Sequence, residues 1–224
     1  MVRPIDLSLY LVTDEHLARG RDLAGIVAWA IDGGVTCVQV RDKSGATRRL
    51  LERVRAVRAV ASPRGVPVLV DDRLDVALAA DADGVHLGQD DLPAKDARRL
   101  LGPARILGVT AADPAAARRA ECDGADYIGS TAVYPTATKP DAGPAIGLDG
   151  LSAIVRAVRI PVVGIGGINR ENAALVLAAG VAGIAVVSAI LGAPDPRLAA
   201  AELATVVRVA RPSDADRFTG RSRA

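Results

Sequence analysis

The sequence predicts a single-domain (β/α)8 TIM barrel, an α/β fold in which eight parallel strands alternate with helices. The first observation is length, because 224 residues is a normal size for this fold and long for an average domain. The second is the alternation of short apolar segments with amphipathic helical stretches. The third is composition: 50% of residues are hydrophobic but only 2% are aromatic, which favours a helix-covered sheet over a sandwich. We expect the barrel to span residues 1–210, and residues 211–224 to form a disordered tail.

Eight segments are predicted to be strands. Their near-continuous apolar character is typical of parallel strands that are buried on both faces. They are residues 9–13, 36–40, 66–71, 84–87, 105–109, 127–129, 162–165 and 183–187. An open doubly wound sheet is the alternative fold. However, the one candidate for its dinucleotide loop, residues 164–167, lacks the GxGxxG spacing, so the barrel is favoured.

The segments between these strands have the spacing of amphipathic helices. Leu23, Ile26, Val27 and Ala30 repeat at the intervals of one buried helix face. The same spacing recurs around residues 50–57 and 203–210. Asp113-Pro114 is typical of a helix N-cap followed by proline at the first helical position.

The charge pattern argues against a nucleic-acid-binding protein. The formal net charge is +2, and residues 211–224 alone carry four Arg against two Asp, so the rest of the chain is formally neutral. The two Cys form no CxxC motif, the start lacks a signal-peptide pattern, and no apolar run could span a bilayer. We therefore expect a cytoplasmic protein without a nucleic-acid or membrane partner. Whether it forms a homo-oligomer stays open.

Two acidic residues stand where a metal site would be expected. Active sites of such barrels lie at the carboxyl ends of the strands, and Asp72 and Asp91 follow neighbouring strands. Two carboxylates without a His or Cys partner suit Mg²⁺, which proteins hold by one or two carboxylates together with substrate phosphates. The alternative is a pair of helix N-caps. The residues alone leave both interpretations open.

Three cations, Arg41, Lys43 and Lys139, are expected at the same mouth of the barrel. Arginine can bind two phosphate oxygens with its planar fork, whereas lysine acts as a point charge. A surface cation is usually only solvated, so none of the three is informative alone. Together with two carboxylates for a metal, they indicate a pyrophosphate site.

A second anion site is expected at the last two strands. Gly166 and Gly167 follow the seventh strand and Ser188 follows the eighth, where phosphate-binding barrels present backbone N–H groups. The glycines could instead serve a tight turn, and both interpretations can hold together. The loop of residues 134–140 follows the sixth strand and would lie between the two anion sites as a lid.

No pair of residues indicates a protein nucleophile. His86 lies inside the fourth predicted strand and is interpreted as a hydrogen-bonded packing residue, not as an acid–base catalyst. The sequence contains no plausible Ser/His or Cys/His constellation.

Five motifs occur in order over nearly the full length and together resemble the thiamine-phosphate synthase family. They are Tyr10-Leu11-Val12-Thr13-Asp14, Gln39-Val40-Arg41-Asp42-Lys43, Gly84-Val85-His86-Leu87-Gly88-Gln89-Asp90-Asp91, Tyr134-Pro135-Thr136-Ala137-Thr138-Lys139 and Gly164-Ile165-Gly166-Gly167-Ile168. The match ends near Val186-Val187-Ser188-Ala189-Ile190 and leaves out the tail. The resemblance implies an alkyl transferase that couples a pyrimidine diphosphate to a thiazole phosphate with Mg²⁺ and releases pyrophosphate.

The resemblance also implies a role for each matched residue. Asp72 and Asp91 would bind the metal, and Arg41, Lys43 and Lys139 would neutralise the leaving pyrophosphate. The residues implied to bind the pyrimidine diphosphate are Gln39, Val40, Arg41, Asp42, Lys43, Asp71, Thr110 and Lys139. Those implied to hold the thiazole phosphate are Thr136, Ala137, Thr138, Gly167, Val187 and Ser188.

Two matched positions depart from the family's usual residues. Asp71 replaces the common Asn, and Thr110 replaces the common Ser. Thr keeps the hydroxyl, whereas Asp71 adds a possible negative charge and removes an amide donor, which could weaken diphosphate binding or offer the metal another ligand. A thiazole tautomerase-like barrel and a non-catalytic phosphometabolite-binding barrel are the alternatives. The Asp72, Asp91 and Lys139 set argues against both.

Overall fold

The computed structural model describes residues 5–18, 20–43, 46–136, 138 and 143–210, and it is a closed parallel barrel. Each strand pairs with the next in sequence, and β1 pairs with β8 to close the sheet. The strands are β1 (Leu9–Val12), β2 (Cys37–Val40), β3 (Val68–Asp71), β4 (Gly84–Leu87), β5 (Ile106–Ala111), β6 (Tyr127–Ala132), β7 (Val162–Ile165) and β8 (Gly183–Val186). The predicted (β/α)8 barrel is confirmed.

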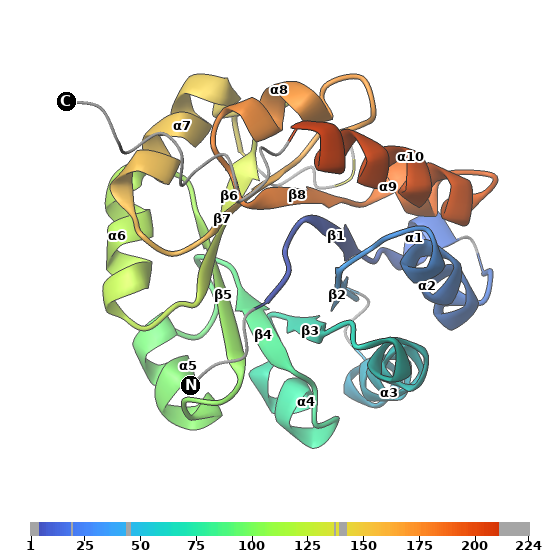
Figure 1. Ribbon diagram of the computed structural model, residues 1–224. Helices are drawn as coiled ribbons and strands as arrows, with labels where there is room; N and C mark the ends of the chain where they lie inside the picture. The colour runs from blue at the N-terminus through green and yellow to red at the C-terminus, as the bar shows by residue number, and fades with distance from the viewer. Residues whose placement is uncertain (1–4, 19, 44–45, 137, 139–142, 211–224) are drawn as a thin grey trace.

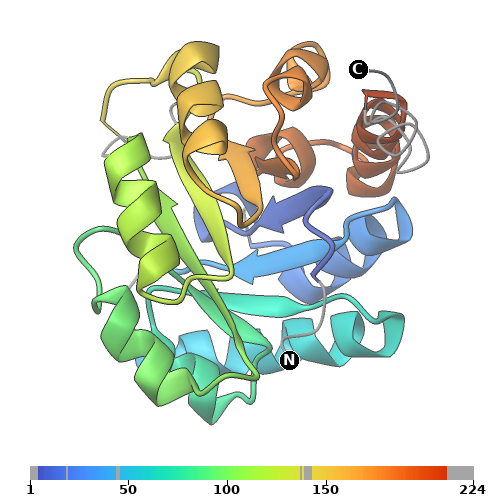
Figure 2. The same ribbon diagram turned by 60° about the vertical axis from the view of Figure 1, so that its left-hand side comes forward.

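Helices surround the strands on the outside of the barrel, as both views show (Figure 1, Figure 2). They are α1 (Glu15–Ala18), α2 (Leu23–Asp32), α3 (Thr47–Ala61), the 3-10 turn η1 (Ser62–Arg64), α4 (Leu74–Ala79), α5 (Ala94–Leu101), α6 (Pro114–Cys122), α7 (Gly147–Ala157), α8 (Ala173–Ala178), α9 (Ser188–Leu191) and α10 (Pro196–Ala210). No helix within the described ranges is both long and apolar enough to cross a membrane.

The helical spacing read from the sequence matches the buried faces. Ile26, Val27 and Ala30 of α2 are buried against the barrel. Asp113 caps α6 by accepting hydrogen bonds from the next two free backbone N–H groups, and Pro114 occupies the first turn. The buried helix face and the Asp-Pro N-cap predicted from the sequence are therefore both present in the structure.

The buried residues form two separate apolar clusters. The larger one lies between the strands and the surrounding helices. The smaller one lies inside the barrel and includes Tyr10, Cys37, Leu69, Tyr127 and Val163. Side chains alternate between these two environments along each strand, because successive residues of a strand point to opposite faces. The interior cluster forms the floor on which the pocket at the carboxyl ends of the strands rests.

Two strands run further than the sequence predicts, and this changes the position of two polar residues. β5 continues through Ala111, so Thr110 lies within the strand. β6 continues through Ala132, so Ser130 is a buried strand residue and not part of a loop. The polar residues Ser130 and Thr131 do not continue the apolar run, so the sequence did not indicate this extension. The ladder to β7 supports it, with a register irregularity between Gly129 and Ala132. The proposed tail, residues 211–224, lies outside the described residues.

Candidate active site

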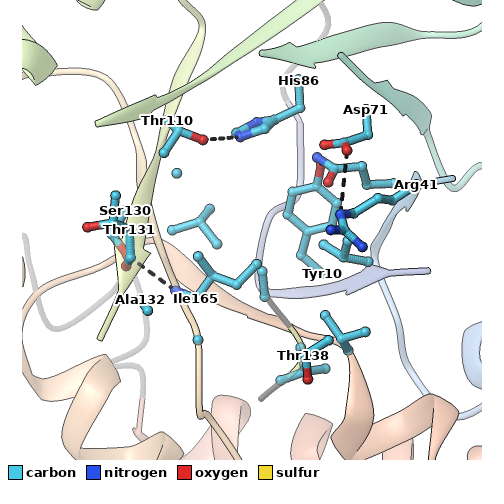
Figure 3. A pocket seen from close by; sticks show the side chains of 18 of the residues that line it. Tyr10, Arg41, Asp71, His86, Thr110, Ser130, Thr131, Ala132, Thr138 and Ile165 are labelled. Atoms are coloured by element: carbon cyan, nitrogen blue, oxygen red, sulfur yellow. Dashed lines mark hydrogen bonds and ion pairs between the residues drawn. The ribbon is translucent and has the colours of Figure 1, made fainter. Parts of the chain in front are cut away.

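A pocket opens at the carboxyl ends of the strands, where the sequence predicted the polar residues to meet. It contains about 1100 Å³ of empty space, part of it open to solvent, which is enough for two small substrates. Figure 3 shows Arg41, Asp71 and His86 on one side of this pocket and Ser130 to Ala132 across from them. Residues from strands on all sides of the barrel thus face one space.

We call Arg41, Lys43, Asp71, Asp72 and Asp91 the charged corner. The guanidinium of Arg41 donates to Asp14 Oδ2 at 2.9 Å and lies 3.6 Å from Asp71 Oδ2. Asp14 is only 7% exposed, so this carboxylate fixes the arginine in place at the pocket wall. Lys43 Nζ lies 3.5 Å from Asp71 Oδ2 and forms a closer ion pair with Asp72.

The carboxyl groups of Asp72 and Asp91 meet at this corner. Burial raises the pKa of Asp91, and contact with the Asp72 carboxyl raises it further. Burial also opposes ionisation of Asp72, but hydrogen bonds with Lys43 and Asp91 outweigh it and lower the Asp72 pKa. Burial likewise opposes the charge on Lys43, yet Asp72 and Asp71 raise its pKa overall. Two acids that resist simultaneous ionisation favour a cation between them.

The donor set at the charged corner fits Mg²⁺. Its oxygens are carboxylates, which suit a hard cation, and the Gly88 N–H donates to Asp91 Oδ2 at 2.6 Å and orients it. Within the described ranges no group of three or more His, Cys, Asp or Glu is arranged to hold a metal. A two-carboxylate set therefore suits a metal that takes its remaining ligands from water and substrate phosphate.

We call Gly166, Gly167 and Ser188 the glycine end of the pocket. Gly166 and Gly167 have φ angles of +93° and +65°, which favour glycine. A Cβ on Gly167 would meet Tyr134 Cβ at 2.7 Å and the Pro135 carbonyl oxygen at 2.8 Å. The Gly167 N–H donates no hydrogen bond to another described residue, and Ser188 begins α9 at the same edge. Free backbone N–H groups of this kind can bind a phosphate.

The loop after β6 reaches the same pocket. Thr136 and Thr138 both line it, and the Thr138 N–H donates to Thr136 Oγ1 at 3.2 Å. Ala137 and Lys139, which the sequence predicted to bind substrate, lie outside the described residues. Their roles and the lid function of this loop stay predictions.

Most of the predicted site residues line the pocket. They are Gln39, Arg41, Lys43, Asp71, Asp72, Thr110, Thr136, Thr138, Gly167, Val187 and Ser188. Val40 instead points into the helix-side core and is fully buried. Asp42 turns away to an ion pair with Arg53, and its side chain is 2% exposed. Asp91 is not among the residues that line the pocket, but its carboxyl contacts that of Asp72 and accepts a hydrogen bond from the Gly88 N–H.

Sequence reasoning missed several residues that build the pocket. Asp14 holds Arg41, and its position at the end of the first strand was a signal that could have been used. Tyr10 and Tyr127 line the floor, although both are almost completely buried. His86 is hydrogen-bonded, as predicted, but its ring also lines the pocket. Thr131 lines it too, and its buried hydroxyl has no partner among the described residues.

Comparison with known proteins gives a consistent answer. The family model described as thiamine monophosphate synthase matches residues 9–190. The thiamine-phosphate synthase of Moorella thermoacetica is 51% identical over 203 residues, covering 91% of this chain and 97% of that protein. The enzyme of the same name from Chloroflexus aurantiacus is 51% identical over 205 residues, covering 92% of this chain and 94% of that protein.

A solved structure agrees with both sequence comparisons. The thiamine phosphate pyrophosphorylase from Pyrococcus furiosus superposes with a TM-score of 0.84 at 42% identity, covering 92% of this chain and 98% of that chain. The fold, the polar residues at the carboxyl ends of the strands and the length of the matches all support the same family assignment. The chain belongs to the thiamine monophosphate synthase family.

Proposed function

We propose that this protein catalyses the family's coupling reaction at the described pocket. It transfers the 4-amino-2-methylpyrimidin-5-ylmethyl group from its diphosphate to a thiazole phosphate. The products are thiamine phosphate and pyrophosphate. The observation that carries this proposal is one pocket with a charged corner at one end and backbone N–H groups at the other.

The charged corner would bind the diphosphate. Arg41 presents a planar fork that Asp14 already orients, and Lys43 adds a point charge. Asp72 and Asp91 would hold Mg²⁺, which when bound supplies positive charge to the diphosphate oxygens. Lys139 would approach the same oxygens from the loop after β6. These groups together neutralise the charge that develops on the leaving group.

The reaction would proceed without a protein nucleophile. The bond between the pyrimidine methylene carbon and the diphosphate oxygen breaks, and pyrophosphate leaves with the electron pair. The electron-rich aminopyrimidine stabilises the methylene cation that remains. The thiazole nitrogen then donates its lone pair to that carbon and forms the new C–N bond. The protein's part is to hold both reactants in line and to keep water away from the cation.

The glycine end would position the second substrate. Gly167 offers a backbone N–H that donates to no described residue, and Ser188, which lines the same pocket, adds a hydroxyl. Thr136 and Thr138 would contact the same phosphate from the loop. A thiazole tautomerase or a phosphate-binding protein could use this end alone, but neither would need the charged corner.

An assay with both substrates and Mg²⁺ tests the proposal. Purified protein incubated with the pyrimidine diphosphate and the thiazole phosphate should form thiamine phosphate and pyrophosphate in equal amounts. Removal of Mg²⁺ with a chelator should stop both products, and addition of excess Mg²⁺ should restore them. Binding of both substrates without product would instead favour the binding-protein alternative.

A further inference from the structure

A chain of hydrogen bonds crosses the interior of the barrel beneath the pocket. Gln39 Nε2 donates to the Tyr10 hydroxyl at 3.0 Å, and this hydroxyl lies 2.9 Å from that of Tyr127. The Tyr127 hydroxyl lies 2.8 Å from His86 Nδ1, and His86 Nε2 lies 2.9 Å from Thr110 Oγ1. The chain thus joins β2, β1, β6, β4 and β5, and both of its end residues line the pocket.

The barrel is shaped to hold these rings. Tyr10 and Tyr127 are 2% and 0% exposed, and their rings pack edge to face with centroids 6.1 Å apart. Gly108 leaves the space that Tyr127 fills, because a Cβ there would meet the Tyr127 hydroxyl oxygen at 2.3 Å. Gly129 does the same for His86, whose Cε1 would lie 2.9 Å from an added Cβ. Neither tyrosine has a role in the coupling chemistry described above.

The direction of these hydrogen bonds follows from counting hydrogens. Each hydroxyl and the neutral imidazole carries one hydrogen to donate. With Gln39 donating to Tyr10, Tyr10 donates to Tyr127 and Tyr127 donates to His86 Nδ1. The imidazole hydrogen then sits on Nε2 and is donated to Thr110. In the reverse direction the buried Tyr10 hydrogen would have only the weak acceptor Cys37 Sγ, which is costly.

We propose that Tyr10 and Tyr127 are positioning residues that act through His86 to make the Thr110 hydroxyl a hydrogen-bond donor into the pocket. Thr110 uses a lone pair to accept from His86, so its own hydrogen is left for a ligand. Gln39 donates one of its two amide hydrogens to Tyr10, and this bond orients the amide so that its carbonyl oxygen can serve a ligand as an acceptor. An acceptor and a donor on one pocket floor match a heteroaromatic ring that carries an amine and a ring nitrogen. This reading of the ligand rests on the proposed function.

The first test reads the His86 tautomer and needs no activity. The sequence contains two His, and His16 is exposed on α1, so it serves as an internal reference. In ¹⁵N-histidine-labelled protein at about pH 8, where imidazole is neutral, His86 should show a single Nε2–H tautomer. Tyr127→Phe should give a mixture of tautomers at His86 and no change at His16. An Nδ1–H tautomer in the unsubstituted protein would overturn the proposal.

The second test measures binding of the pyrimidine diphosphate without thiazole phosphate, so that no turnover occurs. Thr110→Val should weaken binding by about tenfold, as the loss of one neutral hydrogen bond does. Tyr127→Phe should weaken it by a smaller factor, which is the inverse of the fraction of His86 that keeps the Nε2–H tautomer. The double variant should be no weaker than Thr110→Val alone, because both substitutions remove the same bond. Thr110→Ser should restore binding. Additive losses in the double variant would overturn the proposal.

Tyr10→Phe covers the case in which Tyr127→Phe does not fold. It keeps the contact between Tyr127 and His86 but removes both the donor to Tyr127 and the acceptor for Gln39. The His86 tautomer should therefore shift in the same direction as in Tyr127→Phe, by a smaller amount. Thiazole phosphate binding should not change in any of these variants.

A lower melting temperature with unchanged tautomer and unchanged binding would assign the tyrosines a packing role only and overturn the proposal. An inactive native protein with the expected tautomer would reject the coupling function alone.

Discussion

The two ends of the pocket differ in the groups that they present to an anionic substrate. The charged corner gathers two cations and three carboxylates, and their ion pairs already fix Arg41 and Lys43. The glycine end, among the described residues, has no charged side chain, and it depends on backbone geometry that only glycine adopts easily. Cations at the charged corner can stabilise the negative charge that develops on a leaving group. A backbone cradle suits a phosphate whose charge does not change.

The largest effect is expected from Asp72→Ala. Loss of this carboxylate removes a metal ligand and the ion-pair partner of Lys43, so turnover should fall by at least about a hundredfold while the fold stays intact. Initial rates of pyrophosphate release and a circular dichroism spectrum measure both quantities. Asp90→Ala is the matched control, because Asp90 is exposed and lies outside the pocket lining. Near-native turnover in the Asp72 variant would contradict the proposal that the charged corner stabilises the leaving group.

Lys139→Ala should cause a loss of the same order. Its ammonium is expected to neutralise the same leaving group as Mg²⁺, so removal should lower kcat more than it raises KM. Steady-state kinetics with the pyrimidine diphosphate varied would separate the two parameters. An unchanged kcat would mean that this loop serves the glycine end only.

Gly167→Ala should have the next largest effect, at the other end of the pocket. The added Cβ would collide with Tyr134 and Pro135, so the loop must move, and the KM for thiazole phosphate should rise by about tenfold or more. Gly65→Ala is the matched control: its φ is +70°, but an added Cβ meets nothing within 4 Å. It should carry the backbone cost in stability without the change in KM. Equal KM values for thiazole phosphate in the Gly167 and Gly65 variants would contradict phosphate binding at the glycine end.

The affinity for Mg²⁺ should depend on pH through Asp91. Burial and the neighbouring Asp72 raise the pKa of Asp91, so its carboxyl takes up a proton at a higher pH than an ordinary aspartate. Since a protonated carboxyl does not bind the metal, affinity should weaken as pH falls towards that raised pKa. Calorimetric Mg²⁺ titrations in the presence of pyrophosphate at several pH values would measure this. A constant affinity down to the usual aspartate range would contradict the assignment of Asp91.

The smallest effect is expected from Asp71→Asn. The amide keeps an oxygen near Arg41 and Lys43, and Asp14 still holds Arg41 at 2.9 Å, so turnover should stay within about threefold. Asp75→Asn, which breaks an exposed pair with Arg73, is the control. A complete loss of activity would show that the Asp71 carboxylate has a role of its own, such as a further metal ligand.

The sequence predicted the barrel and the location of the pocket because both follow from periodicity. Buried parallel strands are continuous apolar runs, and the polar residues at their ends must meet when the sheet closes. The end of β6 was missed because the polar residues Ser130 and Thr131 interrupt the apolar run, although the ladder to β7 continues past them. Local pattern cannot report a pairing that is decided by a neighbouring strand.

The parts of the site that could not be predicted depend on contacts between distant residues. Asp42 was expected at the substrate, but Arg53 of α3 draws its side chain away from the pocket. Tyr10 and Tyr127 are 117 residues apart in sequence, and the closed barrel brings their hydroxyls to 2.9 Å. Sequence spacing identifies which strand ends lie at the same end of the barrel. It does not identify which side chains form hydrogen bonds or ion pairs there.

The most direct test of the two-ended pocket is a crossed binding experiment. Calorimetry would measure the affinity of Asp72→Ala and Gly167→Ala for each substrate separately, with Mg²⁺ present. Asp72→Ala should lose affinity for the pyrimidine diphosphate and keep it for the thiazole phosphate, and Gly167→Ala should show the opposite pattern. Equal losses of both substrates in both variants would contradict the assignment of one substrate to each end.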